Sequence, residues 1–159
     1  MQPVGIAHTT FAAVSMALGL GVLLMPKGTT VHRVIGMLYV LSMFGLNVTA
    51  LTIYRVFGGF GVFHAFAVLS LVSLLSGFAA AFLKQPRHAW LPYHYYSMGW
   101  SYVGLCAAAG AEVAVRLPGV PFALGVAVPT IAITVLGGAW IQMRARDAVA
   151  RAQQGHRAA

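Results

Sequence analysis

Glu112 is the residue with the clearest chemical potential in this chain of 159 residues. It is one of only two acidic residues and lies within the apolar run from Cys106 to Val115. An unpaired charge in hydrocarbon costs at least about 2.5–3.5 kcal/mol, so a carboxylate there is expected to be paired, protonated or bound to a metal. The sequence therefore raises the question of what Glu112 faces.

Two histidines are expected at the same depth as Glu112. His8 lies near the start of the first apolar segment and His64 near the start of the third, while Glu112 precedes the end of the fourth. Two neutral imidazoles and one carboxylate are the ligands of a catalytic zinc site, in which Zn²⁺ lowers the pKa of a bound water toward about 7. The set His8, His64 and Glu112 is thus the predicted metal site, with Glu112 also a candidate catalytic residue.

The fourth segment supports an inward-facing polar stripe. His94 and Glu112 are separated by 18 positions (94 to 112), close to five helical turns and about 27 Å along the axis. Ser101 shares that stripe and is a second candidate catalytic residue. The resulting hypothesis is a zinc-dependent hydrolase that acts on an ester or amide of a small amphipathic substrate near the periplasmic face.

Two alternatives stay open. The histidines alternate between the two faces, an arrangement that suits two b-type haems, with His8 and His64 ligating one and His32 and His94 the other. Glu112 could instead pair with Arg116 one turn later, without any metal. With haem the protein would be an electron carrier. A further, non-enzymatic class is a small scaffold or transport subunit in which Glu112 and the histidines relay protons. At the inner face, His32, His88 and His94 are interpreted as structural, or as hydrogen-bonded to Tyr93, Tyr95 or Ser97, rather than as ligands.

The elements that would position these residues are transmembrane helices. The chain is 60% hydrophobic and only 8% charged, with a mean hydropathy of +0.83, which excludes an ordinary soluble domain. Apolar segments of about 20 residues, enough to cross a bilayer, are expected at 5–25, 31–54, 60–83, 92–115 and 121–142. Short loops between them predict an all-α integral membrane protein, a compact antiparallel bundle of five helices spanning residues 1–143.

The cationic residues predict the orientation of the bundle. Most of them fall on one side of the five-helix arrangement: Lys27, Arg33, Lys84, Arg87, Arg144, Arg146, Arg151 and Arg157. Because positive loops stay in the cytoplasm, the N-terminus is expected outside and the C-terminus inside a bacterial cytoplasmic membrane. This topology explains the net charge of +8. The basic cytoplasmic tail, 144–159, is expected to lie against anionic membrane lipid, and no nucleic-acid partner is expected.

Polar and small residues on the remaining helices suggest how the bundle packs. On the second segment Ser42 and Thr52 are expected to bond between helices, and Asn47 is the most costly to leave unpaired. Thr30 is expected to cap this helix. Small residues on the fifth segment favour close packing, either within the bundle or in a homo-oligomer.

The stretch Pro26-Lys-Gly-Thr-Thr-Val-His-Arg-Val-Ile-Gly-Met-Leu-Tyr39 resembles the signature of a family of small bacterial multi-spanning membrane proteins. That family is known only as a predicted membrane domain of unknown function. The resemblance extends to His8, His64 and His94-Tyr-Tyr-Ser97 and covers the chain to about residue 116. It implies the multi-helix fold and draws attention to the histidines, without implying an activity. The predicted zinc site is also similar in kind, though not in sequence, to those of the intramembrane ceramidase and adiponectin-receptor group, in which histidine and acidic ligands from several helices lie near one membrane face.

Overall fold

The computed structural model describes residues 2–54 and 58–157, with side chains described as far as Ala145. Five helices follow one another: α1 (Pro3–Leu24), α2 (Thr30–Leu51), α3 (Val62–Leu83), α4 (Trp90–Ala114) and α5 (Phe122–Arg157). No strand occurs in the described ranges. The all-helical prediction is confirmed, and the expected segments differ from helices α1 to α4 by only a few residues at each end.

Four of these helices are long and apolar enough to cross a membrane, namely α1, α2, α3 and the Phe122–Ala145 part of α5. Helix α4 is also long, but its first turns carry Tyr93, His94 and Ser97, which lower its hydropathy. Helix α5 continues through the tail to Arg157 because this segment is rich in alanine, arginine and glutamine and contains no proline. The sequence prediction ended the fifth helix at residue 142.

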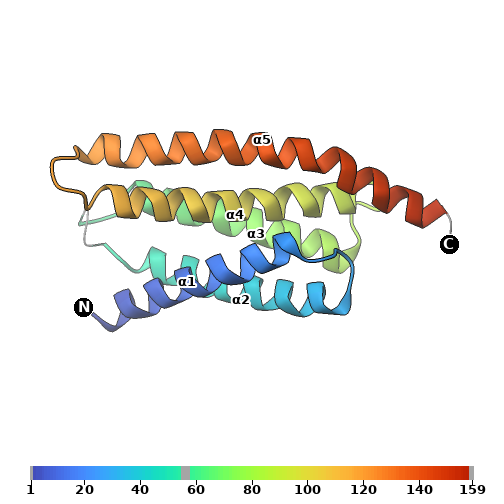
Figure 1. Cartoon of the computed structure of the whole chain (residues 1–159). Coiled ribbons are helices and arrows are strands. Elements are labelled where there is room, and N and C mark those ends of the chain that lie inside the picture. Colours follow the sequence, from blue (N-terminus) through green and yellow to red (C-terminus); the bar gives the residue numbers. More distant parts are fainter. Residues whose placement is uncertain (1, 55–57, 158–159) are drawn as a thin grey trace. The chain divides into compact units, whose positions relative to one another are not determined.

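The chain divides into two compact units, Met1–Leu74 and Leu75–Ala159, each described here by itself. In the first unit α1 and α2 form an antiparallel hairpin joined by a short loop (Figure 1). Ser15 and Ser42 share a 2.6 Å hydrogen bond across this hairpin, and both side chains are buried. The interhelical role expected for Ser42 is therefore present. Thr52 instead donates to the carbonyl of Thr49 on its own helix, at 2.8 Å.

Residues of the loop between α1 and α2 cap the end of α1 and the start of α2. Lys27 donates to the carbonyls of Val22, Leu23 and Met25, at 2.6, 2.8 and 3.1 Å, and so satisfies the C-terminal end of α1. The cap of α2 is Thr29, whose Oγ1 accepts the backbone N–H of His32 at 3.1 Å. The prediction of Thr30 as the cap was wrong by one residue, because Thr29 has the extended backbone of a cap and Thr30 is already helical. Asn47 is buried and donates to the carbonyl of Met43, which removes the cost of an unpaired amide.

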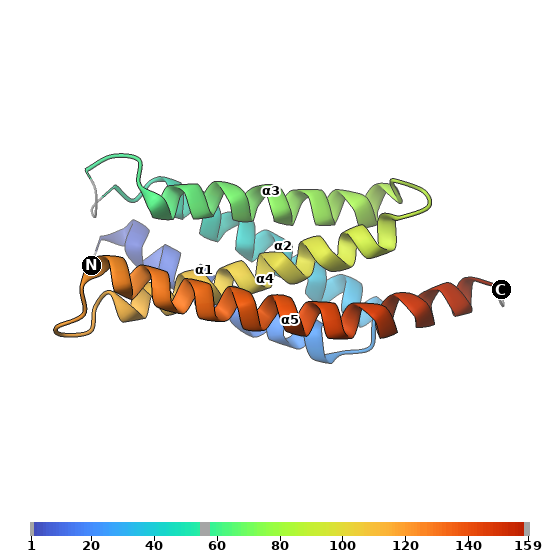
Figure 2. The ribbon, with the colours of Figure 1, turned by 90° about the horizontal axis from the view of Figure 1, so that it is seen from above.

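In the second unit α4 and α5 run side by side (Figures 1 and 2). Glycines bring the two helices close together. A Cβ atom at Gly137 would lie 2.5 Å from Val103 Cγ2, and one at Gly138 would lie 2.9 Å from the Trp100 ring. Small residues of α5 thus pack within the chain, against α4, as one of the two sequence alternatives proposed.

Replacing Gly137 with alanine should destabilise this helix pair. The added methyl overlaps Val103, a short branched side chain that has little freedom to move, and such overpacking typically costs about 1–3 kcal/mol. Gly104→Ala is the matched control, because a Cβ there meets nothing within 4 Å. Thermal unfolding in detergent should show a lower midpoint for Gly137→Ala and an unchanged or higher one for Gly104→Ala; equal midpoints would contradict the packing.

Candidate functional site

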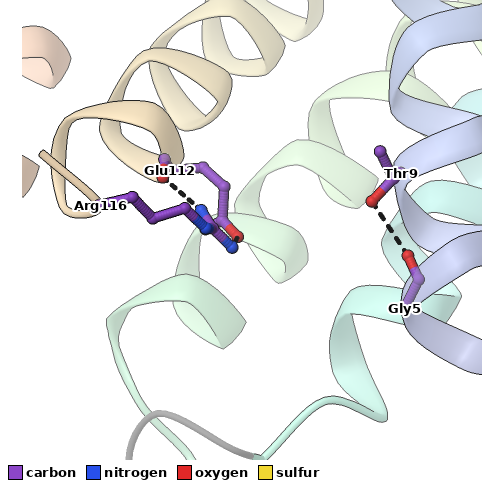
Figure 3. Close-up of polar contacts among 4 residues, drawn as sticks. All are labelled: Gly5, Thr9, Glu112 and Arg116. Carbon is purple, nitrogen blue, oxygen red and sulfur yellow. Dashed lines mark hydrogen bonds and ion pairs between the residues drawn. The ribbon is translucent and has the colours of Figure 1, made fainter. Parts of the chain in front are cut away.

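Glu112 on α4 forms an ion pair with Arg116 one turn later. Arg116 Nη2 lies 2.5 Å from Glu112 Oε1, and Arg116 Nη1 also donates to the Glu112 carbonyl (Figure 3). The Arg116 and Glu112 side chains are 65% and 47% exposed, respectively. The paired alternative from the sequence is thus present, and the carboxylate has a counter-charge without a metal ion. Its predicted roles in zinc binding and catalysis stay predictions.

His94, in the first turns of α4, makes a hydrogen bond that fixes its tautomer. Its Nδ1 lies 2.8 Å from the carbonyl oxygen of Gly77 on α3, within the second unit. A carbonyl only accepts hydrogen bonds, so Nδ1 carries the proton and Nε2 carries the lone pair. Metal-binding histidines characteristically donate their other ring N–H to a carbonyl or carboxylate in this way. His94 is therefore oriented like a ligand.

Gly77 makes this contact available because it lacks a side chain. A Cβ atom at Gly77 would lie 2.8 Å from Ser97 Cβ and 3.1 Å from Met98 Sδ, so α3 and α4 approach closely here. The sequence interpretation had expected Tyr93, Tyr95 or Ser97 as the partner of His94. The structure instead gives a backbone carbonyl, for which a glycine within an apolar helix is the only sequence signal.

The tautomer of His8 on α1 is constrained by a threonine hydroxyl on α2. Its Nδ1 lies 3.2 Å from Thr49 Oγ1 on α2. That hydroxyl also lies 2.9 Å from the carbonyl of Gly45 and 2.8 Å from that of Leu46, and its single proton is directed to these acceptors. With the Thr49 proton on one of these carbonyls, a neutral His8 ring donates from Nδ1 and has its lone pair on Nε2. His8 is therefore also oriented like a ligand.

His64 near the start of α3 has the opposite tautomer. The backbone N–H of Gly61 donates to its Nδ1 at 3.1 Å, so the proton of the neutral ring is on Nε2. To bind a metal through Nε2, His64 would have to release Gly61 or lose its ring proton. The residue is only 3% exposed, and Nε2 has no hydrogen-bond partner among the described residues. A buried donor without a partner costs about 1–3 kcal/mol.

The other candidates lie in different surroundings. Ser101 on α4 is buried, at 1% exposure, which agrees with an inward-facing stripe; its catalytic role stays a prediction. His32 is half-buried at the start of α2, and His88 is exposed in the loop before α4. His8, His32 and His64 belong to the first unit, and His94, Ser101 and Glu112 to the second.

Taken within each unit, the described side chains contain no group of three or more histidine, cysteine, aspartate or glutamate residues placed to hold a metal ion. Single histidines oriented as ligands are present in both, His8 in the first and His94 in the second. Such histidines suit a cofactor that needs few protein ligands.

Comparison with known proteins places the chain in a family. No curated protein and no solved structure matches this chain significantly. Residues 5–147, which include all the candidate residues above, match the model of a family described as predicted membrane protein (DUF2306). The fold and this match together make the chain a multi-pass membrane protein. The chain thus belongs to the DUF2306 family of predicted membrane proteins.

Proposed function

We propose that this protein is a membrane electron carrier that binds haem b with His94 as an axial ligand. The observation that carries the proposal is the 2.8 Å hydrogen bond from His94 Nδ1–H to the Gly77 carbonyl. It requires a proton on Nδ1 and fixes the orientation of the ring, so that in the neutral imidazole the lone pair for iron is on Nε2. Haem iron in electron carriers takes imidazole ligands and requires no carboxylate.

Nearby cations suit the rest of the cofactor. Lys84 and Arg87 lie in the loop that leads into α4, a few residues before His94, and both are exposed. Lys84 Nζ lies 3.7 Å above the Trp90 ring. These two side chains would bind the haem propionates through charge-assisted hydrogen bonds. When bound, the haem supplies one-electron redox chemistry, while the chain orients it and excludes water.

His8, taken within the first unit alone, is a candidate ligand of a separate haem, because its Nδ1–H bond to Thr49 gives it the same tautomer as His94. His64 is not supported as a ligand of haem or zinc, since its Nδ1 already accepts the Gly61 N–H. This differs from the pairing of His8 with His64 in the original two-haem hypothesis. Of these two histidines, only His8 is retained as a proposed haem ligand.

The zinc hydrolase hypothesis has weaker support. It requires Zn²⁺ on His8, His64 and Glu112, of which Glu112 is paired with Arg116 and His64 has its proton on Nε2. A catalytic zinc site needs three protein ligands, whereas haem needs one or two. Hydrolysis of an amphipathic ester or amide is therefore the second candidate, and His8 is the one predicted ligand whose tautomer favours it.

The proposed arrangement in the membrane follows the charge distribution. All five helices would cross a bacterial cytoplasmic membrane as one antiparallel bundle, with the N-terminus outside and the basic end of α5 inside. Lys84, Arg87 and His94 would then lie toward the cytoplasm, where positive loops are retained. Assembly into a homo-oligomer is compatible with this arrangement but has no specific contact in its favour.

Removing the His94 imidazole should remove haem from the protein. Protein produced with added haem precursor and purified in detergent should contain haem, measured per chain as its pyridine haemochrome. His94→Ala and the better-matched His94→Gln should both lose most of this haem, because neither retains an imidazole for the iron. His88→Ala is the control, since His88 is exposed in the adjacent loop. Haem-free wild-type protein, or full haem content in His94→Gln, would contradict the proposal.

Neutralising Glu112 should leave the cofactor in place. Its ion pair with Arg116 is an exposed i,i+4 pair, which contributes only about 0.3–0.5 kcal/mol. Glu112→Gln and its partner variant Arg116→Gln should therefore show wild-type haem content and nearly wild-type unfolding temperature. Metal analysis of the same samples checks the rival hypothesis: stoichiometric zinc in the wild type that disappears in Glu112→Gln alone would favour the zinc site.

A further inference from the structure

His64 combines deep burial with an unused hydrogen-bond donor. The residue is 3% exposed, its Nδ1 is occupied by the Gly61 N–H, and its Nε2–H has no acceptor among the described residues. Buried donors of this kind are uncommon in native proteins, and each requires an explanation such as water, an ion or a ligand. Neither haem nor zinc provides one here, because both need a lone pair and Nε2 carries a proton.

Two aromatic rings border this donor. The Tyr54 ring stacks on the His64 ring, with centroids 4.7 Å apart and an interplanar angle of 24°. The Phe60 ring lies 5.1 Å away, tilted by 32°. Both side chains are themselves exposed, Tyr54 by 49% and Phe60 by 69%, so either can rotate aside and uncover the imidazole. The surroundings of the donor are therefore flat, aromatic and adjustable.

These features define the ligand. It must offer a hydrogen-bond acceptor to Nε2–H, and it must have a planar ring to stack against the imidazole and the remaining aromatic side chain. It should also partition into the membrane, because His64 lies on α3, which is long and apolar enough to cross it. A phosphate headgroup meets the first condition but is costly to desolvate beside two aromatic rings. A quinone meets all three, since its ring is planar and neutral and carries carbonyl acceptors.

We propose that His64, Tyr54 and Phe60 form a binding site for the headgroup of a membrane quinone. The Nε2–H of His64 donates to one quinone carbonyl, and the quinone ring takes the place of one of the two aromatic rings beside the imidazole. Such a ligand would be the natural redox partner of a haem electron carrier. The binding site itself does not depend on haem, because all three residues belong to the first unit and none is a proposed haem ligand.

Thermal unfolding tests the site directly, since a ligand that binds the folded state raises the midpoint with concentration. The probe is a short-chain ubiquinone added to the full chain in lipid nanodiscs. The wild type should be stabilised in a saturable manner. His64→Leu, which removes the donor, should weaken binding at least about tenfold, whereas His64→Gln, which retains an amide N–H, should stay within about threefold of the wild type.

Ligand-free unfolding midpoints and a control variant separate loss of quinone binding from loss of folding. Without quinone, His64→Leu loses both a buried donor that has no partner and the acceptor of the Gly61 N–H, two opposing effects, so its quinone-dependent shift is measured from its own ligand-free midpoint. His88→Ala should match the wild type in both measurements. A wild type without saturable stabilisation, or equal stabilisation of wild type and His64→Leu, would overturn the proposal. The haem-deficient His94→Gln variant should still bind quinone, so that a failure of the haem proposal is distinguished from a failure of the quinone site.

Discussion

The backbone partners of the Nδ1 atoms of His64 and His94 are the interactions on which the proposed chemistry of this protein depends. A carbonyl at Nδ1, as Gly77 provides for His94, leaves the lone pair of the neutral imidazole on Nε2, as the proposed haem ligation requires. An amide N–H at Nδ1, as Gly61 provides for His64, makes the imidazole a donor through Nε2. Two side chains of the same type thus have opposite tautomers, because a neutral imidazole has one proton and two nitrogens.

Close packing of α3 and α4 allows His94 to reach the Gly77 carbonyl. Backbone carbonyls inside a helix are normally committed to the helix itself, but a carbonyl has two lone pairs and can accept a second bond. At Gly77 the absence of a side chain lets α4 approach α3 near Ser97 and Met98, and the His94 ring reaches the exposed lone pair. The glycines of α5 serve the same purpose against α4, where Gly137 contacts Val103. Both close approaches therefore require small residues at the helix contacts.

Much of the fold could be predicted from the sequence, because a bilayer imposes length and hydropathy on every span. All five helices were expected at nearly their observed positions. The continuation of α5 to Arg157 was not expected, since the change from apolar to basic residues after Gln142 marks a membrane boundary but does not end a helix. Thr29 rather than Thr30 caps α2, a difference of one residue that depends on backbone angles.

The candidate site was less predictable. The sequence drew attention to Glu112 and the histidines, and it offered Arg116 as a partner of Glu112, which the structure shows. It could not reveal the partners of His64 and His94, because both are main-chain groups, which have no sequence signature beyond a glycine. Side-chain type indicated the candidate residues, whereas the tautomers of His94 and His64 depend on a contact between two helices and on a contact with the loop before α3.

The most direct test of this account is nitrogen NMR of the protein with ¹⁵N-labelled histidine, in the haem-free state and at a pH where the rings are neutral. Single replacements of His8, His64 and His94 assign the signals. Protonated Nδ1 in His8 and His94, together with protonated Nε2 in His64, is the predicted result. The same tautomer in His64 and His94 would contradict the central claim that their backbone partners assign them different roles.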